Sequence, residues 1–238
     1  ALRYWNTMTS FVVPNRFCGP PDSGNGGYTC GMVAKELGGA VECTLRMPVP
    51  LNVSLRIERT EKGAVLRDDD KVVIEAVPTT VDIDPPATIS FEAATTAMAS
   101  SAALDPRHPF PTCFVCGPKR GVHDGLRIFP APIAGGQYAA AWVPDHEFGD
   151  DQHILRSEFL WAAMDCPTGF ASGFPSVGKL VTGRLAVEQL RPILTGENCV
   201  LMSWPLGVEG RKHFSAACLY QQEELCAVGR ATWIKVEG

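Results

Sequence analysis

The stretch of sequence that decides the fold is Ser23-Gly24-Asn25-Gly26-Gly27-Tyr28-Thr29-Cys30-Gly31-Met32-Val33-Ala34. Its glycine pair follows an asparagine, a favoured helix-capping residue, so we expect a helix to begin there with accessible backbone N–H groups. A second stretch has the same character without the glycines, and it reads Arg156-Ser157-Glu158-Phe159-Leu160-Trp161-Ala162-Ala163-Met164-Asp165. It ends in a carboxylate that the first stretch lacks. If the two stretches pack face to face, each supplies what the other is missing.

The size and composition of the chain restrict the classes of protein to which it can belong. Its 238 residues suit one large domain or two of about 120 residues, and 45% apolar with 20% charged residues favours a packed core. The net charge of −5 argues against nucleic acid or an anionic membrane as the main partner. No apolar run approaches the roughly 18 residues that span a bilayer. Residues 1–10 lack a basic region followed by an apolar core, so we expect no signal peptide.

The nine cysteines are odd in number and lie scattered through apolar segments. This pattern favours reduced, buried thiols in a cytoplasmic protein over a disulfide framework. Cys113 and Cys116 have the spacing of half a zinc site, which would need about two more ligands, with His108, His123 or Cys18 as candidates. We favour a tight turn with buried thiols, and we therefore predict no metal and no cofactor.

The order of predicted elements occurs twice along the chain. In the first half, a helix at 26–37 precedes predicted strands at 41–47, 51–59, 64–67 and 71–76. In the second half, strands at 125–129 and 137–143 precede a helix at 157–171 and strands at 179–191, 199–204, 213–221 and 226–236. A linking helix at about 90–103, capped by Ser90, joins the halves. The pattern predicts an α+β tandem repeat with halves at 1–103 and 104–238.

Three stretches of the second half resemble a known family. They are Cys113-Phe114-Val115-Cys116-Gly117-Pro118 followed by Gly125-Leu126, the predicted helix 156–171, and the strand and turn of residues 180–197. Together they resemble the hotdog-fold acyl-CoA thioesterases. The first half resembles the same fold through Asn25-Gly26-Gly27 and through Met47-Pro48-Val49-Pro50-Leu51, so the whole chain resembles a double hotdog. The resemblance implies that each half wraps a central helix in an antiparallel sheet and that the halves pair side by side.

The resemblance also implies how the site is divided. In this family the thioester carbonyl lies near the N-terminus of one unit's helix, and a carboxylate from the other unit's helix performs the chemistry. That carboxylate lies nine positions after the histidine of a His-Gly-Gly motif. Here Arg156 holds the histidine place and Asp165 lies nine positions later, whereas Asn25 is followed at the same interval by Ala34. Thr182 matches a Ser or Thr that lies close to the carboxylate.

The resulting hypothesis is one composite site. Asp165 would be the general base or nucleophile, with Thr182 bonded to it or to the attacking water. Asn25 would orient the carbonyl, and Gly26 and Gly27 would let it approach the helix backbone. Further candidates for substrate contact are Tyr28, Arg156, Ser157 and Trp161. The reciprocal combination of residues 156–158 with Ala34 lacks an acid and should be inactive or structural.

Several residues keep more than one interpretation. Asn25-Gly26-Gly27 alone would fit a turn and helix start. Asp165 could be an exposed helix residue or a cap before Pro167, which we expect to end or kink the helix. The apolar flanks of Asp165 favour a functional acid instead. His146 and His153 are candidates for a substrate channel or for the surface. Four basic residues are candidates for contacts with CoA phosphates: Lys119, Arg120, Lys179 and Arg191.

Three functions remain open. The favoured one is hydrolysis of an acyl-CoA or related acyl thioester, and the alternative is a non-catalytic acyl- or CoA-binding hotdog protein. An enoyl-CoA hydratase would need a paired Asp and His, for which Asp105 to His108 is a poor match. The acyl chain, the choice between CoA and an acyl carrier protein, and assembly into a homo-oligomer are left open.

Overall fold

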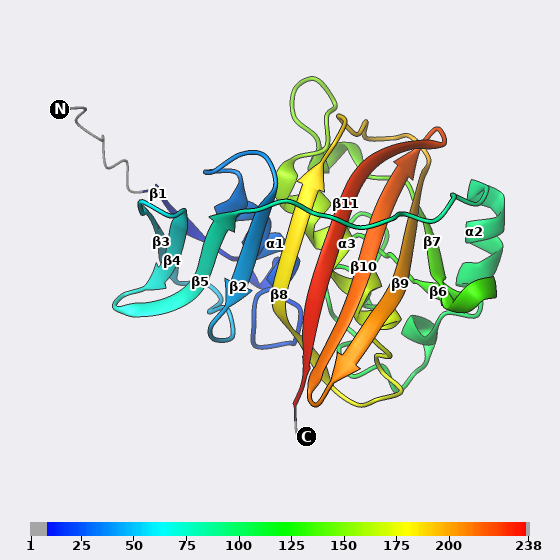
Figure 1. Ribbon diagram of the computed structural model, residues 1–238, viewed down its shortest axis with the longest axis horizontal. Coiled ribbons are helices and arrows are strands. Elements are labelled where there is room, and N and C mark those ends of the chain that lie inside the picture. Colours follow the sequence, from blue (N-terminus) through cyan, green and yellow to red (C-terminus); the bar gives the residue numbers. More distant parts are fainter. Residues whose placement is uncertain (1–8, 237–238) are drawn as a thin grey trace.

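A computed structural model describes residues 9–236, and residues 1–8, most of the stretch considered for a signal peptide, lie outside it. One antiparallel sheet runs through the molecule, with its strands in the order β1-β3-β4-β5-β2-β8-β11-β10-β9-β7-β6 (Figure 1). The strands are β1 (Thr9–Val12), β2 (Val41–Leu45), β3 (Ser54–Arg59), β4 (Ala64–Asp68), β5 (Lys71–Pro78), β6 (Ala131–Pro132), β7 (Tyr138–Trp142), β8 (Leu180–Gln189), β9 (Cys199–Glu209), β10 (Lys212–Gln221) and β11 (Glu224–Lys235). The helices are α1 (Gly26–Ala34), α2 (Phe91–Met98) and α3 (Ser157–Ala171).

The two halves of the sheet have the same connectivity. Helix α1 is followed by β2 to β5, which lie in the order β2-β5-β4-β3, and α3 is followed by β8 to β11 in the order β8-β11-β10-β9. The first strand after each helix lies at the centre, where β2 pairs with β8 in antiparallel register from Val41 opposite Val187 to Thr44 opposite Arg184. A helix followed by four antiparallel strands therefore lies on either side of this central pair.

Helices α1 and α3 lie together on one face of the sheet, behind it in Figure 1, and pack directly against each other. Glycine makes this close approach feasible. A Cβ atom on Gly27 would lie 2.5 Å from both the Asp165 Cβ and the Trp161 carbonyl oxygen, and one on Gly31 would lie 2.6 Å from the Glu158 Cα. The predicted face-to-face packing of the two stretches is therefore present. It depends on glycine at positions 27 and 31 of α1, where any side chain would collide with α3.

The opposite face of the second half is covered by the chain itself. Residues 79–90 leave β5, cross in front of the sheet and lead into α2, which packs on β7 and β9 (Figure 1). Apolar side chains of this crossing segment and of α2 cover a smaller core on β7, β9, β10 and β11. The Tyr220 hydroxyl donates a hydrogen bond of 2.7 Å to the Pro86 carbonyl. The predicted cap is confirmed, since the Ser90 side chain accepts from the Ala93 N–H.

Other sequence predictions differ from the structure. Helix α1 ends at Ala34 rather than at 37, because the chain leaves it through the tighter i→i+3 bonds of Glu36 and Leu37. Residues 125–129 form no strand; the N–H groups of Leu126 and Ile128 instead bond to carbonyls of the preceding loop. Strand β1, which pairs with β3, was not expected. Pro167 does not end α3, which continues to Ala171.

Within residues 9–236, no helix is both long and apolar enough to cross a membrane. All nine cysteines lie in this part of the chain, each as a free and buried thiol, which agrees with the expectation of reduced thiols.

Candidate active site

The carboxylate of Asp165 lies at the contact between the two central helices. Its side chain is buried, with a relative exposure of 1%. One oxygen, Oδ2, accepts hydrogen bonds from the Gly27 N–H at 3.0 Å and from Nδ2 of Asn25 at 3.3 Å. The other, Oδ1, accepts from the Thr182 hydroxyl at 2.8 Å. The acid of one half is thus held by the helix start of the other half and by a neighbouring strand.

Local structure explains why these donors converge. Asn25 caps α1, because its Oδ1 accepts from the Tyr28 N–H at 2.8 Å, and this leaves its Nδ2 directed at Asp165. The Gly27 N–H belongs to the first turn of α1, where backbone donors have no partner within the helix. The carboxylate therefore sits at the positive end of a helix macrodipole.

A β-bulge in β8 positions the Thr182 hydroxyl, the third donor to Asp165. The register between β8 and β11 shifts so that Arg184 lies opposite Thr232 and Thr182 opposite Trp233, which leaves Gly183 as the extra residue. An extra residue changes which side chains face each side of the sheet. Leu185 therefore points into the core between sheet and helices, and Thr182, on the other side of the bulge, still reaches Asp165.

The environment of Asp165 raises the pKa of its carboxyl group. Burial raises the pKa of this carboxyl group to about 7, opposed by the hydrogen bonds from Thr182 and Gly27; the nearby Cys113 raises it further, and the bond from Asn25 lowers it. A carboxyl group with a pKa near neutrality can accept and return a proton at physiological pH, which general base catalysis requires.

A cavity of about 620 Å³ opens beside the carboxylate. Asn25, Gly26, Asp165 and Thr182 line one part of it. Most of the remaining wall is apolar and includes Leu45, Met47, Phe110, Phe170, Phe174 and Trp233. Two exposed basic residues, Arg46 and Lys179, also border the cavity. The cavity combines an apolar compartment with a few convergent polar groups, the usual character of a small-molecule site.

Four predicted substrate contacts lie elsewhere. Tyr28 is buried and stacks on Phe17, with ring centroids 4.2 Å apart. The Arg156 guanidinium donates to the carbonyls of Glu147 and Phe148, in the loop before α3. Ser157 and Trp161 line a second cavity of about 420 Å³. The structure places none of these four residues beside the Asp165 cavity.

The second cavity lies where α1 ends and α3 begins. Ala34, which corresponds to Asp165, lines it together with Ser157, which corresponds to Gly26. No acidic residue is among the described residues that line it, although Lys35 and Arg191 are. The chain thus has two similar helix-end cavities, and a carboxylate is found in one.

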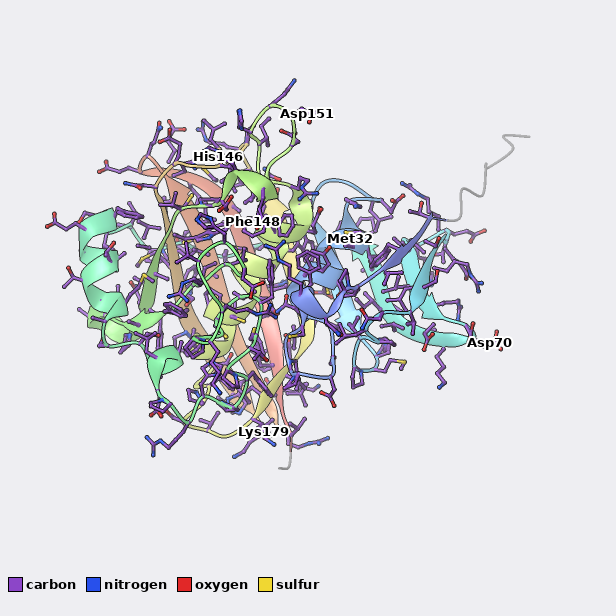
Figure 2. All side chains as sticks on the ribbon, turned by 180° about the vertical axis from the view of Figure 1, so that it is seen from behind. Met32, Asp70, His146, Phe148, Asp151 and Lys179 are labelled. Atoms are coloured by element: carbon purple, nitrogen blue, oxygen red, sulfur yellow. The ribbon has the colours of Figure 1, made fainter. Side chains whose placement is uncertain are left out.

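Of the candidate histidines and basic residues, some border one of the two cavities and others border neither. His146 and His153 do not line the Asp165 cavity, and Figure 2 shows His146 at the end of the molecule opposite Lys179. Of the basic residues considered for CoA phosphates, Lys179 borders this cavity and Arg191 the second one, whereas Lys119 and Arg120 border neither. Arg46 was not expected from the sequence. It lies just before the Met47–Leu51 segment that carries the resemblance, and that position is the signal that could have indicated it.

Sequence reasoning also missed Cys166. Its Sγ lies 3.7 Å from the Sγ of Cys113, although the two residues are distant in sequence. Its place directly after Asp165, a predicted site residue, was the available signal.

Comparisons with known proteins support the fold. No protein-family model matches the sequence, and a comparison with curated proteins gave no match. Among solved structures, a proposed thioesterase from Novosphingobium aromaticivorans is 12% identical with a TM-score of 0.65, over 97% of this chain and 96% of that one. The tesB protein of Mycobacterium avium subspecies paratuberculosis is 12% identical with a TM-score of 0.63, over 97% and 93% of the two chains.

A third structure, a conserved protein of unknown function with a hot dog fold from Alicyclobacillus acidocaldarius, extends this likeness. It is 13% identical with a TM-score of 0.61, over 100% of this chain and 97% of that one. At sequence identities this low, the structural likeness establishes the fold, and the function has to be argued from the residues of the site. The resemblance inferred from the sequence motifs is therefore confirmed at the level of the fold, and the chain is a hotdog-fold protein.

Proposed function

We propose that the protein hydrolyses an acyl-CoA or a related acyl thioester at one composite site between two hotdog halves. The observation that carries this proposal is the position of Asp165, a buried carboxylate of α3 held at the N-terminus of α1 and facing a largely apolar cavity. One full-length structural neighbour is named as a proposed thioesterase, which is consistent with this chemistry.

Each residue of the site has a task in this proposed reaction. The acyl chain occupies the apolar wall, and Gly26, whose added Cβ would lie 3.2 Å from Thr182, leaves room for the thioester carbonyl at the first turn of α1. Partial positive charge at that helix end stabilises the oxyanion. Asp165 acts on the carbonyl carbon as nucleophile, or as the base that takes a proton from attacking water. In the base route, attack by water breaks the carbon–sulfur bond, and the proton taken by Asp165 passes to the leaving sulfur. In the nucleophile route, the carbon–sulfur bond breaks as Asp165 forms an anhydride with the acyl group, and water then hydrolyses this anhydride. Both routes release the thiol and the carboxylic acid.

Two further parts of the proposal concern organisation and location. The repeated connectivity supports two hotdog halves at 1–103 and 104–238, each providing what the other lacks. The linking helix α2 packs on the second half, although it precedes that boundary. The nine free thiols support a reducing compartment such as the cytoplasm.

The direct test is a panel of short-, medium- and long-chain and aromatic acyl-CoAs, with thiol release followed by a disulfide reagent. We expect hydrolysis of at least one member at a rate that depends on Asp165. Saturable binding of acyl-CoA without thiol release, across the panel, would instead establish the non-catalytic binding alternative. Hydration of a 2-enoyl-CoA by the same protein would argue for a different hotdog chemistry.

Replacing Thr182 with valine should lower kcat/KM about tenfold, because the carboxylate loses its 2.8 Å hydrogen bond while the side-chain volume is kept. Serine at the same position retains the hydroxyl and should restore most of the loss. The measurement is steady-state hydrolysis of the best acyl-CoA from the panel. Equal activity of the valine and serine variants would show that the hydroxyl does not assist Asp165.

A further inference from the structure

Three cysteine side chains meet on the wall of the Asp165 cavity. Cys113 and Cys116 belong to the loop that opens the second half, and Cys166 belongs to α3. Their Sγ atoms all lie within 4.8 Å of one another, and the Cys113 and Cys166 sulfurs are 3.7 Å apart. All three residues are buried with respect to bulk solvent, yet all three border the cavity. The Asp165 mechanism uses none of them.

The spacing of these sulfurs fits one metal ion. A tetrahedral zinc ion holds thiolates at about 2.3 Å, which places two of its sulfur ligands about 3.8 Å apart. The Cys113–Cys166 separation of 3.7 Å agrees with that value. It is far from the roughly 2.05 Å of a disulfide bond. Thiolate ligands favour zinc over magnesium or calcium, which prefer oxygen.

The loop that carries two of the cysteines is shaped around them. Gly117 closes the turn, with its N–H bonded to the Cys113 carbonyl at 2.9 Å, and an added Cβ there would lie 2.4 Å from that oxygen. The turn brings the sulfurs of Cys113 and Cys116 within 4.8 Å of each other. Two cysteines separated by two residues on such a turn have the spacing of half a structural zinc site.

His108 supports the cluster from outside. Its Nδ1 accepts a hydrogen bond from the Phe110 N–H at 3.0 Å, so the neutral ring carries its proton on Nε2. That nitrogen lies 3.6 Å from the Sγ of Cys116 and is therefore placed as a donor to the sulfur rather than as a metal ligand. Hydrogen bonds of this kind orient metal ligands and tune their charge.

We propose that Cys113, Cys116 and Cys166 bind one zinc ion as thiolates, with His108 donating a hydrogen bond to Cys116. Water from the cavity completes the four ligands, because all three cysteines border that space. The ion ties the loop at 113–116 to α3 directly beside Asp165. This inference concerns residues outside the proposed hydrolytic chemistry, and it differs from the sequence expectation of a metal-free turn.

The test begins with the intact, purified protein. We expect about one zinc per chain by elemental analysis after dialysis against metal-free buffer. X-ray absorption at the zinc edge should give three sulfur neighbours at about 2.3 Å and one lighter neighbour. After zinc is exchanged for cobalt, the spectrum should show thiolate-to-cobalt charge transfer. These readouts need neither a substrate nor activity, so their failure is separate from failure of the proposed function.

Matched variants locate the site. Cys166→Ser should lose the cobalt charge-transfer band and bind zinc at least tenfold more weakly. Cys199→Ser removes another buried thiol, outside the cluster, and should keep both properties. His108→Phe removes the donor to Cys116 and should weaken zinc binding about 10- to 100-fold while the sulfur ligands remain. An intact protein that contains no zinc and takes up no cobalt would overturn the proposal, as would a cobalt band unchanged in Cys166→Ser.

Discussion

Replacing Asp165 with asparagine should lower kcat for acyl-thioester hydrolysis at least about 10³-fold without unfolding the protein. An amide can neither accept a proton from water nor attack the carbonyl, and loss of a positioned acid or base typically costs 10² to 10⁴ in rate. The fold should persist because asparagine can make the same contacts. Its Oδ1 would accept from the Gly27 N–H, and its Nδ2 would donate to the Thr182 hydroxyl, which can also accept.

The matched control for this variant is Glu158→Gln. Glu158 is also buried and lies on the same helix, but it does not border the Asp165 cavity. Its amide variant should keep hydrolysis within about threefold, since the change leaves the proton-transfer groups untouched. Circular dichroism and thermal melting of both variants check the fold. Unchanged turnover by folded Asp165→Asn would remove the carboxylate from the mechanism, whatever the control does.

Gly27→Ala should destabilise the protein by about 1–3 kcal/mol, the usual cost of overpacking a well-packed core. The new methyl group would lie 2.5 Å from the Trp161 carbonyl oxygen, which is backbone and cannot rotate away. Helix α1 must therefore move from α3, and the hydrogen bond between Gly27 and Asp165 lengthens. We expect kcat/KM to fall at least tenfold together with the free energy of unfolding, measured by urea denaturation.

Gly121→Ala is the control for this substitution. Gly121 is exposed, and an added Cβ would meet no atom within 4 Å. Its unfolding free energy should stay within about 1 kcal/mol of the parent, and its hydrolysis should be unchanged. A Gly27→Ala protein as stable as the Gly121→Ala control would show that the two helices are less tightly packed than the structure indicates.

Much of the architecture could be predicted because local signals and packing agree. Asn25 and the glycines after it mark a helix start by capping chemistry alone, and the alternation of apolar residues marks most strands. The meeting of Asp165 with Gly27 required more, namely the repeat and the family resemblance. In the structure, the backbone nitrogen of Gly27 lies 3.0 Å from a carboxylate oxygen of Asp165. The catalytic role of each residue remains a prediction.

The failures share a physical cause, which is that tertiary contacts decided the outcome. Pro167 has the propensity to end a helix, but α3 is buried along nearly its whole length and continues through it. Residues 125–129 have a strand-like composition, yet their backbone bonds to the Cys113–Cys116 loop instead of to the sheet. The third thiol of the cysteine cluster comes from a distant helix, so no spacing rule could include it.

The crossing segment at residues 79–90 also constrains how copies of this protein can associate. It and α2 already cover the outer face of β7, β9, β10 and β11 with their own apolar side chains. A second molecule that stacked on this side would first have to displace a piece of the chain and expose that core to water. Stacking of another copy on the outer face of these four strands is therefore disfavoured.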